Sequence, residues 1–186
     1  MKTVSVRRSG DASSDNSVPY FRTALALLIL ALSASCTVSP TPGRVQEQVT
    51  TRGADDVVRE LYAQPERWAS VLNHIETGDP EWIAAALVLR PGSDAGSTSM
   101  LNDSMFAALE KAPEIVITYA FPTFDLASVC GGRIDPLPTY EQGVRELEVT
   151  LAAVSRIQDP VLESRKRACL AQLEESRSHL KRFFHR

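Results

Sequence analysis

Apolar residues recur at intervals of three and four along most of the chain after residue 54, which is the period of an amphipathic α-helix. The clearest stretch carries Trp68, Val71, Leu72 and Ile75 at positions i, i+3, i+4 and i+7. Aromatic residues are scarce at 6%, which suits helices packed through aliphatic side chains and suits a β-sandwich poorly. The pattern predicts an all-α fold.

Helix start and stop signals divide this region into about six helices. Asp79-Pro80 and Asp159-Pro160 each place an N-cap residue before a first-turn proline. The segment 82–89 is apolar on nearly all sides, which predicts a buried central helix. The polar residues 93–97 are predicted to form a flexible loop, with Thr98 or Ser99 capping the helix that follows.

Residues 114–121 are the one place where a strand competes with a helix, because several of them are β-branched. Pro113 at the start and the helical surroundings favour a short helix. Residues 122–138 contain several prolines and glycines, which predicts a loop with a possible helical turn at 124–129.

Two longer helices are predicted to end the chain, one over 140–158 and one from 160 to near the end. Each has a line of apolar residues with nearly heptad spacing, which predicts a long antiparallel helical hairpin. A compact bundle and a short array of helical hairpins both remain open for the whole.

A different kind of segment precedes this region. Residues 23–34 form an apolar run of twelve residues without charge. As a helix this run would measure about 18 Å, which is short of the roughly 30 Å hydrocarbon core of a bilayer. It is therefore interpreted as the apolar part of an export signal peptide.

The small residues Ser33-Ala34-Ser35 lead directly into Cys36. This arrangement resembles the lipobox of bacterial lipoproteins, although the leucine usual three places before the cysteine is here one place further back, at Leu32. The resemblance implies that Cys36 receives a lipid and becomes the first residue of the mature protein. The alternatives are cleavage to a soluble periplasmic form and an uncleaved signal anchor.

These features predict three parts: a signal peptide over 1–35, a lipid-attached flexible tether over 36–53, and a helical domain over 54–186. The tether is predicted because proline, threonine, serine and glycine dominate its beginning. Within the lipoprotein family, Thr37 rather than aspartate after the cysteine implies the outer membrane, with the domain facing the periplasm.

The net charge of the chain does not favour binding to polyanions. The net charge is −3, and the part from Cys36 onward carries 16 basic and 21 acidic residues, which gives −5. A mildly acidic domain gives no electrostatic reason to expect binding to nucleic acid, or docking on anionic lipid.

With Cys36 lipidated, Cys130 and Cys169 remain as an even number in an oxidising compartment. We expect a disulfide between them, which by the chain-entropy argument would add about 3 to 4 kcal/mol of stability. The alternative is a pair of buried thiols.

No motif for nucleotide binding, metal binding or nucleophilic catalysis is found in the sequence, and no cofactor is expected. An envelope hydrolase with a dispersed site, built from residues such as Asp94, Asp103 or His74, is one alternative function. A periplasmic carrier of a small ligand is another. The preferred hypothesis is a non-enzymatic module that binds another envelope protein or takes part in an assembly.

A possible partner surface surrounds the turn at Gly78. Trp68 and Trp82 flank this turn with Asp79, and Asp94 lies in the next predicted loop. Exposed tryptophans would mark a binding surface. The alternative is that both tryptophans are core residues that bridge adjacent helices.

Overall fold

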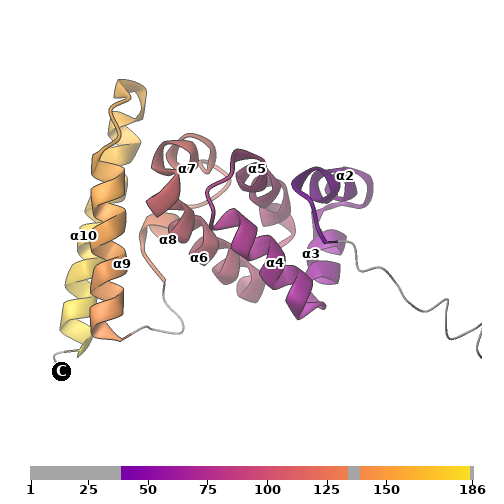
Figure 1. Cartoon of the computed structure of the whole chain (residues 1–186), viewed down its shortest axis with the longest axis horizontal. Helices are drawn as coiled ribbons and strands as arrows, with labels where there is room; N and C mark the ends of the chain where they lie inside the picture. The colour runs from indigo at the N-terminus through magenta and orange to yellow at the C-terminus, as the bar shows by residue number, and fades with distance from the viewer. Residues whose placement is uncertain (1–38, 134–138, 185–186) are drawn as a thin grey trace, which may run out of the picture. The chain divides into compact units, whose positions relative to one another are not determined.

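Helices account for the regular structure of the computed structural model, which describes residues 39–133 and 139–184. The chain divides into two units, residues 1–38 and Ser39–Arg186, and the second unit is compact (Figure 1). No strand occurs among its described residues. The all-α fold is confirmed.

The described residues contain nine α-helices rather than about six, together with two short 3-10 helices, η1 and η2. Their bounds are α2 Pro42–Arg52, α3 Ala54–Tyr62, α4 Pro65–Ile75, α5 Pro80–Leu89, η1 Arg90–Gly92, α6 Ala95–Lys111, α7 Pro113–Tyr119, α8 Leu126–Cys130, α9 Tyr140–Ser155, η2 Pro160–Leu162 and α10 Glu163–Phe184.

The flexible tether predicted over 36–53 is wrong for residues 42–52. These eleven residues form helix α2, which packs against other helices. Thr41 caps the helix through its side chain, and Pro42 occupies the first turn. Val45 is buried, and α2 packs against α5 and α3. Arg52 forms a 2.6 Å ion pair with Glu60 of α3, and this contact lowers the pKa of Glu60. The helical unit therefore begins well before residue 54.

Helix α5 is the buried central helix that the sequence predicts. It packs against α2, α3, α4 and α7, and half of its residues are buried. Helix α6 begins at Ala95, four to five residues earlier than predicted, because Asp94 and Ser97 form a capping box. The predicted flexible loop at 93–97 is therefore wrong for residues 95–97, which form the first turn of α6, and only residues 93 and 94 connect η1 to this helix.

Helix α7 settles the ambiguous segment in favour of a helix. It packs against α5, α6 and α9, and Val116 and Ile117 are fully buried. Arg165 of α10 donates hydrogen bonds to the carbonyl oxygens of Ile117 and Thr118, at 3.2 and 3.1 Å. The possible helical turn before residue 130 is helix α8.

Helices α9 and α10 form the predicted antiparallel hairpin and lie side by side along their length (Figure 1). Cys169, Leu173 and Leu180 of α10 are buried along the seam. Phe184 at the end of the seam stays partly exposed and contacts the ring of Tyr140, with 5.7 Å between ring centroids.

The close approach of η1 to α3 gives a test of this packing. A Cβ on Gly92 would overlap backbone atoms of Ala54 and Asp55, which cannot rotate away as a side chain can. We expect Gly92→Ala to lower the free energy of unfolding by about 1 to 3 kcal/mol in urea denaturation. Gly43→Ala in α2 is the control, because nothing lies within 4 Å of its Cβ position. It should leave stability unchanged or raise it slightly, since alanine favours helix. Equal losses in both variants would contradict the packing described.

Candidate functional site

Cys130 and Cys169 form the expected disulfide. Cys130 ends α8, Cys169 lies in α10, and both are completely buried. Their sulfur atoms are 2.09 Å apart and their Cα atoms 5.3 Å apart. The bond holds the short helix α8 against the hairpin.

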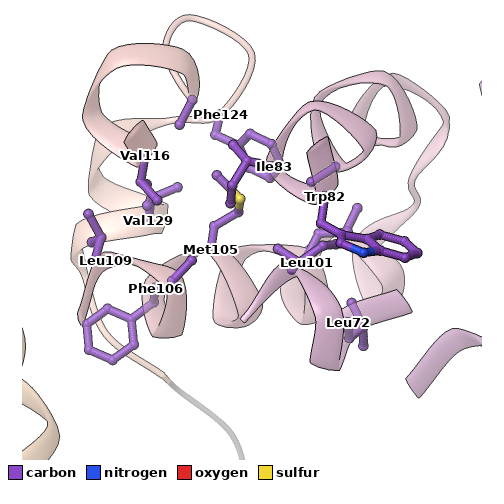
Figure 2. Close-up of a cluster of buried hydrophobic side chains, with 14 of the residues drawn as sticks. Leu72, Trp82, Ile83, Leu101, Met105, Phe106, Leu109, Val116, Phe124 and Val129 are labelled. Carbon is purple, nitrogen blue, oxygen red and sulfur yellow. The ribbon is translucent and has the colours of Figure 1, made fainter. Parts of the chain in front are cut away.

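The two tryptophans are core residues, so the alternative interpretation of them is confirmed. Trp68 is 2% exposed and Trp82 is 7% exposed. The indole nitrogen of Trp68 donates a hydrogen bond to the sulfur of Met100 at 3.3 Å. Trp82 lies in the same buried cluster as Leu101 (Figure 2). Neither side chain can serve as the centre of a partner surface.

The two aspartates of the predicted partner surface are helix caps. Asp79 accepts hydrogen bonds from the backbone N–H groups of Glu81 and Trp82 at the start of α5. Asp94 accepts hydrogen bonds from the hydroxyl of Ser97 at 2.7 Å and from its backbone N–H at 3.0 Å. Their roles are local and structural, so the four residues do not form the predicted surface.

The hydrogen bonds at the Asp94 cap lead to a prediction about how stability depends on pH. The hydrogen bonds from Ser97, first from its hydroxyl and then from its backbone N–H, lower the pKa of Asp94 below its usual 3.8. A lowered folded-state pKa gives stability that is present above the unfolded-state value and lost as pH falls through the folded-state value. We expect the stability of the wild type relative to Asp94→Asn to be constant above about pH 5 and to fall below about pH 4. Urea denaturation across this range measures it, and a flat difference would contradict the assignment.

A groove of about 410 Å³ lies between the hairpin and the helices that pack on it. From α10 it is lined by side chains at i, i+4, i+7, i+8 and i+11, which lie on one face of a helix: Gln172, Ser176, His179, Leu180 and Phe183. From α9 it is lined by Gly143, Glu146 and Leu147. The long helices thus supply most of its two walls.

Helices α6 and α8 complete the groove with Phe106, Ala127 and residues 131–133. Gly132 has a positive φ of 82°, a conformation that favours glycine, and its Cβ position lies 3.4 Å from Leu147. Because the disulfide fixes Cys130, it also positions this lining segment.

The groove combines an apolar centre with polar edges. Phe106, Leu147 and Leu180 are nearly buried, whereas Phe183 is 56% exposed. Arg133 forms a 3.1 Å ion pair with Glu76, the residue that follows α4, and this contact ties this part of the lining to the helices behind it.

The residues considered for a hydrolase do not line the groove. His74 is exposed in α4 and stacks on Trp82, with ring centroids 4.8 Å apart. Asp94 and Asp103 lie in the cap and middle of α6, and neither contributes to the lining. Among the residues described, no group of three or more histidine, cysteine or acidic side chains is arranged to hold a metal ion.

The groove could not be predicted from the sequence. The spacing along α10 was visible, but a line of residues does not reveal which neighbouring helices stand on either side of it. Cys36 and the apolar run before it lie outside the described residues. In the part of the chain that is described, no helix has the length and hydropathy needed to cross a bilayer.

No protein-family model, curated protein or solved structure matches this chain.

Proposed function

We propose that this protein is a non-enzymatic binding module of the bacterial cell envelope, attached to a membrane by a lipid on Cys36. Its helical unit would hold a segment of another envelope protein in the groove between α9, α10, α6 and α8. The observation that carries the binding role is this groove, with the large exposed ring of Phe183 at its edge.

The composition of the groove supports a protein partner. Protein-binding sites combine a desolvated apolar centre with a polar rim, and aromatic side chains are enriched in them. Here Phe106, Leu147 and Leu180 supply the apolar centre, and Glu146 and Gln172 supply polar atoms. An apolar side chain from a partner would cover Phe183 and remove its ring from water, which is favourable.

The cellular location that we propose for the protein is inferred from its sequence. The apolar run over 23–34 and the small residues before Cys36 support export and lipid attachment. By the same resemblance, Thr37 supports the outer membrane, with the helical unit facing the periplasm.

The size of the groove favours one second candidate, a carrier of a small apolar ligand. Its volume of about 410 Å³ falls within the range of roughly 300 to 1,000 Å³ typical of ligand pockets. Native mass spectrometry of protein purified from its own cells distinguishes the two. A bound species of a few hundred daltons would favour the carrier, whereas a bare chain would favour the protein-binding role.

Site-specific photo-crosslinking in living cells tests the protein-binding role. A photoreactive amino acid at Ser176 would lie in the groove, and the same amino acid at Ser164 provides an exposed control in the first turn of α10. We expect one discrete protein adduct from position 176 and none of that size from position 164. The same adducts from both positions, or none from position 176, would contradict the proposal.

A further inference from the structure

The end of α10 carries a positive charge that the net charge of the protein hides. Residues 176–186 contain four arginines and lysines and no acidic residue, which gives +4. Residues 36–175 contain 12 basic and 21 acidic residues, which gives −9. The charge is therefore strongly divided between this short segment and the rest of the protein.

The last four described residues of this segment, 181–184, are all exposed and combine two cations with two aromatic rings. Lys181 and Arg182 are exposed, and among the described residues neither forms a salt bridge. Phe183 and Phe184 beside them are 56% and 40% exposed, and their ring centroids are 5.4 Å apart. One turn earlier, Arg177 pairs with Glu174 at 2.6 Å, so the unpaired cations are those nearest the end of the helix.

Two effects give this combination an affinity for one kind of surface. Cations near an anionic bilayer are attracted to its headgroups, and exposed aromatic rings enter the boundary between headgroups and acyl chains. Cations in the last turn also complement the helix dipole, which accounts for their favourable effect on folding but not for two phenylalanines exposed beside them.

We propose that the C-terminal end of α10 docks on an anionic phospholipid surface through Lys181, Arg182 and the ring of Phe184, since the ring of Phe183 lines the groove. This contact is separate from the lipid on Cys36 and goes beyond the proposed function. A basic patch attracted to anionic headgroups is a further contact with the membrane beside a lipid anchor. Lys181 and Arg182 do not line the groove, so the two sites can be altered independently.

Vesicle binding tests the contact in the predicted mature chain, residues 36–186, with Cys36→Ala in every arm, so that neither the apolar run over 23–34 nor a lipid is present. The vesicles are phosphatidylcholine alone, or equal parts of phosphatidylcholine and phosphatidylglycerol. The test variant is Lys181→Gln/Arg182→Gln. The control is Arg156→Gln/Arg167→Gln, which removes the same charge from exposed positions at the opposite end of the hairpin. Lys181 lies about 21 Å along α10 from Arg167, well beyond the screening length in physiological salt.

We expect the test variant to lose about 30-fold in partitioning onto the anionic vesicles and the control to lose less than about twofold. The chain that keeps Lys181 and Arg182 should also bind the anionic vesicles more weakly in high salt. Circular dichroism melting confirms that both variants are folded, which separates docking from the effect of the cations on the helix.

Three results would overturn the proposal. The first is equal losses in the two variants, which would mean that only net charge matters. The second is no loss in a folded Lys181→Gln/Arg182→Gln variant. The third is binding to a single-stranded oligonucleotide that requires Lys181 and Arg182, without binding to vesicles, which would show that the end of α10 binds nucleic acid. None of these results bears on the groove, which the photo-crosslinking tests separately.

Discussion

Replacing Cys130 and Cys169 together with alanine is expected to lower the free energy of unfolding by about 4 kcal/mol. The two residues are 39 positions apart, so the bond closes a long loop and restricts the unfolded chain strongly. Helix α8 has only five residues, too few to be stable alone, and it depends on its attachment to α10. The loss should therefore be large.

Urea denaturation of the wild type and the double variant measures this effect. Unfolding the wild type with and without dithiothreitol separates the loss of the bond from the loss of two buried sulfur atoms. Cys36→Ala is the matched control and should unfold like the wild type. A loss of less than about 1 kcal/mol would show that the bond does not constrain the unfolded chain as this loop length requires.

Trp82→Ala is the second substitution with a large expected effect, a loss of about 3 to 5 kcal/mol. Its ring is 7% exposed and packs in the cluster around Leu101, so alanine would leave a cavity (Figure 2). Tyr119→Ala is the control, because Tyr119 is 59% exposed and should change stability by no more than about 0.5 kcal/mol.

Thermal and urea unfolding of both variants would make the comparison. The loss of stability also shows independently whether Trp82 is a core residue or a residue of a partner surface. If Trp82→Ala were as stable as Tyr119→Ala, the side chain would belong to the surface and not to the core.

Helices with their own periodicity and caps could be predicted from sequence. In α4 the spacing of Trp68, Val71, Leu72 and Ile75 identifies the buried face directly. In α5 the cap at Asp79 and the first-turn proline fix the start. These signals are local, because a helix forms its hydrogen bonds within itself.

Helix α2 could not be predicted in this way, because its stability depends on distant residues. Val45 and Val49 are the apolar residues on its inner side, too few to give a clear period. The helix that α2 contacts most is α5, about forty residues later in the chain. The one local signal was Thr41-Pro42, a cap followed by a first-turn proline, which resembles the openings recognised at residues 79 and 159.

The candidate sites differ in how much the sequence revealed. The disulfide followed from counting cysteines. The groove could not be predicted, because it forms where α9 and α10 pack beside Phe106 and Gly132. These residues are far apart in the sequence, and no local pattern indicates that they lie together. The charged end of α10 was visible in the sequence, but the net charge of the domain hid it.

Lipid attachment at Cys36 is tested by the intact mass and membrane fractionation of the protein from its own cells, beside a Cys36→Ala variant. The account predicts a chain that begins at Cys36 and carries acyl chains, and membrane attachment that the variant largely loses, since the basic end of α10 alone binds only weakly. A chain that begins elsewhere and carries no lipid would contradict it.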